Sequence, residues 1–124
     1  MSVQGGLVMA RNKDPKELVI KLLKRSSCAV QTAAVLTTNG IVTATGWNHS
    51  GCTGFGCHAE EMLFKRANLK HIPKSVLYVA AKRKKSGSSV MAKPCAFCHS
   101  FAKNCAYIIY RDKRNEWITM RGEL

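Results

Sequence analysis

Acidic residues are scarce in this sequence. The 124-residue chain carries seven Asp and Glu against 20 Lys and Arg, which gives a formal net charge of +13. Between Met62 and Tyr110 there are ten basic residues and no acidic one. Such an excess of positive charge raises the local concentration of anions and favours polyphosphate partners. The alternative is a basic surface that serves solubility only, because a charge count carries no information about specificity.

Long apolar runs and an export signal are also absent. No run approaches the roughly 18 apolar residues that a membrane span requires. The first residues lack the charged, apolar and small-residue layout of a secretory signal. We therefore expect a soluble, intracellular (cytoplasmic) protein without a membrane partner. The length and the 46% of hydrophobic residues suit a single domain over 1–124, of which we allow residues 1–13 to be disordered.

Local signals place the secondary structure. Asp14 can cap a helix, and Pro15 suits the first turn of that helix. Asn39-Gly40, between two β-rich runs, is a strong signal for a hairpin. The elements that we expect are a helix over 14–26, strands over 28–37 and 41–47, a helix over 58–69, a buried strand over 75–81, a basic, flexible loop over 82–93, a helix over 95–104, and strands over 106–110 and 116–120.

The last two expected strands are joined only by the short stretch RDKRN at 111–115. A parallel crossover needs a dozen or more residues, so these strands should be antiparallel neighbours. The order of helices and strands then implies one sheet with helices packed on it.

Six cysteines would form a disulfide framework in a secreted chain, but without an export signal metal binding and buried thiols explain them better. Cys28 and Cys105 are the two that we expect to be buried. Cys95 and Cys98 are spaced to share one helical face, and a helix N-terminus favours thiolates. Two thiolates and one imidazole are a familiar Zn²⁺ set with a fourth position left for water. His58 is the best candidate for the imidazole.

Two alternatives exist for the ligands. Cys57 adjoins His58 and can take its place as a ligand. A zinc ribbon would instead close a tetrahedral site with the four thiolates of Cys52, Cys57, Cys95 and Cys98. In a ribbon Glu60 would be only a surface carboxylate.

Glu60 follows His58 by two residues, and a carboxylate there can exchange protons with zinc-bound water, although helical period alone does not place i and i+2 on one face. The stretches HAE at 58–60 and PCAFC at 94–98 together match the H-x-E and P-C-x-x-C signature of the nucleobase deaminases. The sequence therefore resembles the zinc-dependent cytidine and deoxycytidylate deaminase superfamily. The element order and the GWN before the first motif extend the resemblance over most of the chain.

This resemblance implies an α/β fold: a single three-layer α/β/α domain with a five-stranded mixed sheet and an antiparallel C-terminal hairpin. It implies Zn²⁺ as the cofactor, with His58, Cys95 and Cys98 as ligands and Glu60 as the proton shuttle. The reaction of the family is hydrolytic, with ammonia as the leaving group, and turns cytosine into uracil. Glu61 would remain a solvated helix charge.

The resemblance also implies three substrate contacts. Asn48 in GWN matches an asparagine that contacts a ribose hydroxyl, and the backbone around Ala59 and the carbonyl of Lys93 would hold the edge of the base. The C-terminal hairpin and the long loop before Pro94 are similar to the cytidine deaminase branch, whereas GWN with HAE looks like the tRNA adenosine enzymes. We give the hairpin and the long loop more weight than the short GWN and HAE motifs, and we therefore expect cytosine as the base.

The charge bears on the size of the substrate. A free nucleoside has no net charge and needs no basic field, so we expect cytosine within single-stranded DNA or RNA. The phosphate contacts would come from Lys82, Arg83, Lys84 and Lys85. The alternatives are a free cytidine, deoxycytidine or (d)CMP deaminase, an adenosine deaminase acting on RNA, and a non-catalytic zinc-containing domain that binds nucleic acid. The family resemblance also allows a homo-oligomer.

Overall fold

The computed structural model describes residues 14–49, 58–93 and 102–122. Its elements are the helices α2 (Pro15–Leu22) and α3 (Ala59–Arg66), the 3₁₀ turns η1 (Leu23–Arg25) and η2 (Leu69–Lys74), and the strands β1 (Val30–Thr38), β2 (Ile41–Trp47), β3 (Ser75–Arg83), β4 (Ser89–Val90), β5 (Tyr107–Arg111) and β6 (Trp117–Arg121). The helix expected over 95–104 falls almost wholly outside the described residues.

The strands form one mixed sheet in the order β2-β1-β3-β5-β6, and β4 pairs with β3 beside this path. Strand β1 is antiparallel to both of its neighbours, and β3 runs parallel to β5. Strands β5 and β6 form the expected antiparallel hairpin. The expected count of five strands is wrong by one. Strand β3 continues to Arg83, and Ser89 and Val90, in the stretch expected to be a loop, pair with Lys82 and Ala81 of that strand.

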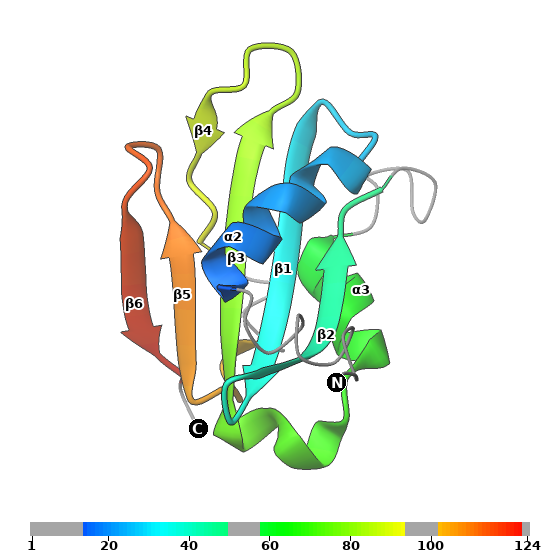
Figure 1. The fold of residues 1–124 in the computed structure, drawn as a ribbon, viewed down its shortest axis with the longest axis vertical. Coiled ribbons are helices and arrows are strands. Elements are labelled where there is room, and N and C mark those ends of the chain that lie inside the picture. The colour runs from blue at the N-terminus through cyan, green and yellow to red at the C-terminus, as the bar shows by residue number, and fades with distance from the viewer. Residues whose placement is uncertain (1–13, 50–57, 94–101, 123–124) are drawn as a thin grey trace, which may run out of the picture.

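Helices cover both faces of this sheet (Figure 1). Helix α2 packs on β1 and β3 from one side, whereas α3 packs on β2 and β1 from the other. Strand β1 is therefore buried on both faces: Ala33 and Val35 face α2, and Ala34 and Leu36 face the α3 side. This confirms the three-layer α/β/α architecture.

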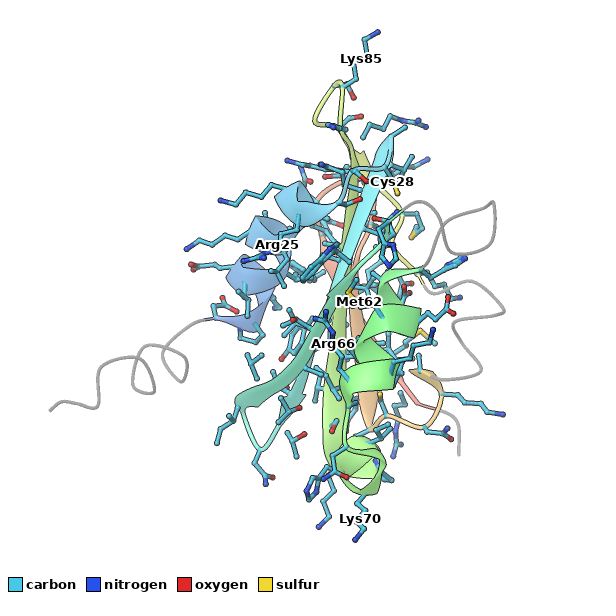
Figure 2. The ribbon with its side chains drawn as sticks, turned by 90° about the vertical axis from the view of Figure 1, so that its right-hand side faces the viewer. Arg25, Cys28, Met62, Arg66, Lys70 and Lys85 are labelled. Atoms are coloured by element: carbon cyan, nitrogen blue, oxygen red, sulfur yellow. The ribbon has the colours of Figure 1, made fainter. Side chains whose placement is uncertain are left out.

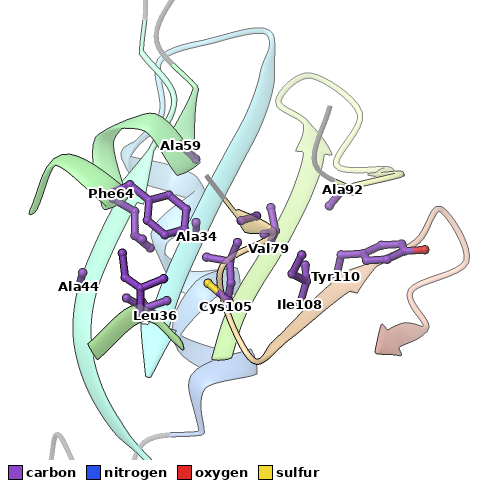
Figure 3. Close-up of a cluster of buried hydrophobic side chains, with 14 of the residues drawn as sticks. Ala34, Leu36, Ala44, Ala59, Phe64, Val79, Ala92, Cys105, Ile108 and Tyr110 are labelled. Carbon is purple, nitrogen blue, oxygen red and sulfur yellow. The ribbon is translucent and has the colours of Figure 1, made fainter. Parts of the chain in front are cut away.

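The larger core lies on the α3 side of the sheet (Figure 3). Phe64 of α3, Leu36 of β1, Val79 of β3 and Ile108 of β5 belong to the same buried cluster. Cys105, only 1% exposed, closes the cluster just before β5. The expectation of a buried thiol is confirmed for Cys105 but wrong for Cys28, which is partly exposed in the loop before β1.

Two local predictions are confirmed in detail. The Asp14 side chain accepts a hydrogen bond from the Lys16 N–H at 2.9 Å, and Pro15 opens helix α2. Asn39 and Gly40 both have positive φ, 54° and 78°, as a two-residue type I′ hairpin turn requires.

The helix expected over 58–69 ends earlier, at Arg66. The chain is extended at Ala67, and the Asn68 side chain then accepts the Lys70 N–H at 3.0 Å, which caps the separate turn η2. No helix in the described ranges is both long and apolar enough to cross a membrane. The cytoplasmic location stays a prediction.

Candidate active site

One open pocket lies where the start of β1, the end of β3 and the start of α3 meet. Its lining residues are Val30, Thr32, His58, Glu60, Ala81, Val90, Met91, Ala92 and Lys93. Because β1 and β3 are antiparallel, the first residues of one strand lie beside the last residues of the other. The fold thus brings His58, Glu60 and Lys93, three of the predicted site residues, to a single pocket.

The first turn of α3 explains how His58 and Glu60 can share this pocket. His58 is the N-cap, with extended backbone angles of φ −71° and ψ 149°, so it lies outside the helical repeat that begins at Ala59. Its carbonyl accepts the Met62 N–H at 3.2 Å, and its side chain makes no capping hydrogen bond. The spacing i, i+2 is therefore no obstacle, because only Glu60 follows the helical period.

Glu60 and its neighbours differ sharply in exposure. Glu60 is 4% exposed and Ala59 is fully buried, whereas His58 is exposed. Glu60 also lines the pocket, so a buried acidic residue borders that space. Glu61 is directed elsewhere and forms an i, i+4 ion pair with Lys65 at 3.6 Å, in keeping with a helix-surface charge.

Gly46 sets how closely α3 approaches the sheet, and the sequence reasoning missed it. A Cβ at Gly46 would lie 2.4 Å from the Ala59 carbonyl oxygen and 2.7 Å from the Leu63 nitrogen. Only glycine therefore allows the first turn of α3 to lie against β2. A glycine inside a β-rich run is a known signal of such close approach, so the GWN stretch did contain the information.

Asn48 lies behind the pocket wall and is not one of the lining residues. Its Oδ1 accepts the Ser26 hydroxyl at 2.6 Å and the Thr32 N–H at 2.8 Å, and its Nδ2 donates to the Val30 carbonyl at 2.8 Å. Both lone pairs of Oδ1 are thus used within the chain. The structure gives Asn48 a role in holding β1, and its contact with a ribose stays a prediction. Ser26 was not foreseen.

The basic residues 82–85 belong to the β3–β4 hairpin. Ala81 and Val90, which face each other across the hairpin, both line the pocket, and the charged turn follows directly. The turn is anchored, since the Lys84 N–H donates to the Ala29 carbonyl at 2.8 Å. Beyond β4, the Ala92 N–H donates to the Arg111 carbonyl at 3.0 Å, which holds the segment leading to Lys93 beside the pocket.

The two predicted thiolate ligands, Cys95 and Cys98, lie outside the described residues. Within 14–49, 58–93 and 102–122, no three His, Cys, Asp or Glu side chains gather in a way that could hold a metal. The described part of the donor set fits the predicted metal, because it offers one imidazole at a pocket with a buried carboxylate beside it. Lys93 ends the described segment directly before the P-C-x-x-C stretch.

Comparison with solved structures identifies the fold. A cytidine deaminase from Burkholderia pseudomallei superposes with a TM-score of 0.67 at 13% identity, over 98% of this chain and 94% of that one. A variant of the cytidine deaminase from Mycobacterium tuberculosis gives a TM-score of 0.54 at 15% identity, over 97% and 92% of the two chains. This chain therefore has the cytidine deaminase-like fold. No protein-family model matches the sequence, and no curated protein does.

Proposed function

We propose that this protein is a zinc-dependent hydrolytic deaminase that converts cytosine to uracil within single-stranded nucleic acid. The observation that carries the proposal is the joint placement of His58 and the buried Glu60 at one pocket, at the start of α3 in a cytidine deaminase-like fold. A buried carboxylate that faces a pocket is suited to proton transfer, which the reaction requires twice.

His58, Cys95 and Cys98 would hold the Zn²⁺. When bound, the metal supplies a water whose pKa is lowered to about 7. Glu60 would take one proton from the attacking water and deliver it to the ring nitrogen N3 of cytosine, and would then pass the second proton from the added hydroxyl to the amino nitrogen. The C–N bond then breaks, ammonia leaves, and the oxygen of the water becomes the new carbonyl oxygen of uracil.

The neighbours of Glu60 would orient the base. Ala59 is fully buried directly before Glu60, so its backbone is held in one position at the start of α3. Lys93 lies on the other side of the same pocket. A base between these two segments would present its exocyclic amino group to Glu60, with the Lys93 carbonyl as an acceptor for that group.

The basic β3–β4 hairpin supports a polymeric substrate. Arg83, Lys84 and Lys85 are exposed on a turn that is joined directly to two pocket-lining residues. A strand whose cytosine entered the pocket would carry its neighbouring phosphates past this turn. Phosphate contacts of this kind give binding that weakens as salt rises.

A free cytosine nucleoside or nucleotide is the second candidate. The structural neighbours are named cytidine deaminases, and this observation favours a small substrate. A non-catalytic zinc domain has less support, because a scaffold needs no buried carboxylate at the metal pocket.

A side-by-side deamination assay tests these candidates with cytidine, deoxycytidine, dCMP, adenosine, and single-stranded DNA and RNA. We expect uracil in oligonucleotides and a loss of roughly 10²–10⁴-fold in Glu60→Gln. Glu61→Gln is the matched control on the same helix. Full activity of Glu60→Gln with zinc still bound would contradict the catalytic proposal. Rapid turnover of cytidine with no conversion of any oligonucleotide would contradict the polymeric substrate.

A further inference from the structure

A second basic feature lies at the β2 edge of the sheet, away from the β3–β4 hairpin. The guanidinium carbons of Arg25 and Arg66 each lie 5.3 Å from the centre of the Trp47 ring. Both distances are within the range of a cation–π attraction. Arg25 ends η1 and Arg66 ends α3, so two elements from opposite faces of the sheet converge on one indole. Figure 2 shows where Arg25 and Arg66 lie.

These two arginines have spare hydrogen-bonding capacity. Both are exposed, and within the described parts of the chain neither forms an ion pair. Arg66 donates one hydrogen bond, from Nη1 to the Thr45 carbonyl at 3.4 Å. A guanidinium has five N–H donors in a fixed fork that matches a phosphate. Stacking on Trp47 restrains both forks without using those donors.

This group of residues is connected to the pocket wall. Ser26 follows Arg25, Asn48 follows Trp47, and the hydroxyl of Ser26 donates to Asn48 at 2.6 Å. Asn48 in turn bonds to the backbone of Val30 and Thr32, which line the pocket. The arginines therefore lie behind the β1 wall of the pocket, whereas the basic turn 82–85 extends from the β3 and β4 side.

We propose that Arg25 and Arg66, held by Trp47, bind backbone phosphates of the single-stranded nucleic acid that flank the target cytosine. This inference rests on the proposed function and adds a second phosphate site to it. The shared chemistry is the phosphodiester, so DNA and RNA are separate arms of the test. The strand would pass from the basic turn, across the pocket, to the β2 edge.

The test measures oligonucleotide binding against salt for the double variant Arg25→Gln, Arg66→Gln. The control is Lys70→Gln, Lys74→Gln, which loses the same charge from exposed residues in η2. Lys70 lies at the opposite end of the molecule from Lys85 (Figure 2). Two lost phosphate contacts should reduce the slope of log K against log salt by about 1.4, and affinity near 0.1 M salt by roughly tenfold or more. The control should keep the parent slope.

A second readout does not depend on charge. Trp47 and Trp117 are the two tryptophans of the chain, so Trp117→Phe leaves Trp47 as the fluorescent reporter. Its emission should change when an oligonucleotide binds. Arg25→Lys with Arg66→Lys serves if the glutamine variant does not fold. It keeps the charge but loses the planar fork, so it should bind more weakly at an unchanged slope.

Three outcomes would overturn the inference. The first is an arginine double variant that binds the oligonucleotide as the lysine control does, and the second is an emission of Trp47 that does not change on binding. The third is displacement of the bound oligonucleotide by polyglutamate as effectively as by unlabelled oligonucleotide. Turnover of free cytidine should stay within about twofold of the parent in both variants, because neither touches the pocket. If the parent protein deaminates no oligonucleotide, the proposed substrate fails. If the parent protein deaminates an oligonucleotide but the arginine variant binds like its lysine control, only the inference about Arg25 and Arg66 fails.

Discussion

Helices α2 and α3 have the same length but begin in opposite ways. Helix α2 starts with a side-chain cap from Asp14 and a proline, two devices that satisfy or remove backbone donors. Helix α3 starts with His58, whose side chain makes no capping hydrogen bond, and has Glu60 buried in its first turn. One helix start is built for stability, and the other gives up a good cap residue in favour of residues that line a pocket.

Replacing His58 with serine should produce the largest effect. Serine is a favourable N-cap, so in chelator-treated protein the free energy of unfolding should rise by up to about 1 kcal/mol. Under the proposed function, deamination should fall by more than about 100-fold, because the substitution removes the imidazole proposed to bind the zinc. Denaturant unfolding of the variant checks the rise in unfolding free energy, and a uracil assay on the same sample checks the fall in deamination. Retained activity would contradict the proposed role of His58 as a zinc ligand.

Gly46→Ala disturbs the same helix start from the sheet, because Gly46 of β2 lies against the first turn of α3. The new Cβ would overlap the Ala59 carbonyl, so α3 must shift, at a cost of about 1–3 kcal/mol in unfolding free energy. Activity should fall as well, because His58 and Glu60 move with the helix. Gly40→Ala is the control: its positive φ makes it destabilising by roughly 1–2 kcal/mol, yet nothing lies within 4 Å of the added Cβ. Equal activity in the two variants would contradict the positioning role of Gly46.

Ser26→Ala should have a smaller effect. It distinguishes two roles of Asn48: holding strand β1, which forms a wall of the pocket, and contacting the substrate directly. It removes the hydroxyl bonded to Asn48 and should lower the unfolding free energy by about 1 kcal/mol. If Asn48 works through β1, kcat/KM should drop severalfold in Ser26→Ala and further in Asn48→Ala. The exposed Ser86→Ala should change stability by less than about 0.5 kcal/mol. A large loss in Asn48→Ala with none in Ser26→Ala would favour the ribose contact instead.

Asp14→Ala is the reciprocal change on α2 and should have the smallest consequence. Loss of the bond to Lys16 should lower the unfolding free energy by about 1 kcal/mol, because one cap is removed. The turnover number should stay at the parent value, since α2 lines no part of the pocket. Thermal unfolding and the deamination rate measured together provide the check. A drop in turnover number would show that the two helix starts are coupled.

The contrast also explains what could be predicted from the sequence. The cap at Asp14 and the turn at Asn39-Gly40 depend on a few adjacent residues, so local rules sufficed. The pairing of Val90 with Ala81 and the contact of Gly46 with Ala59 depend on segments brought together by the fold. Sequence spacing does not specify those distances.

The candidate site divides in the same way. The H-x-E motif named His58 and Glu60, but only the structure shows that an extended N-cap lets both reach one pocket. The hydrogen bonds of Asn48 could not be foreseen, because its partners Ser26, Val30 and Thr32 are 16 to 22 positions away in sequence. The thiolate roles of Cys95 and Cys98 stay predictions.

The buried thiol of Cys105 has a practical consequence. Burial raises its pKa to about 12, so at neutral pH the sulfur is protonated and unreactive. An alkylating reagent can reach it only when the core beneath β5 opens. The rate at which Cys105 is modified would therefore report how often the core beneath β5 opens locally. The partly exposed Cys28 would report the reactivity of the reagent itself.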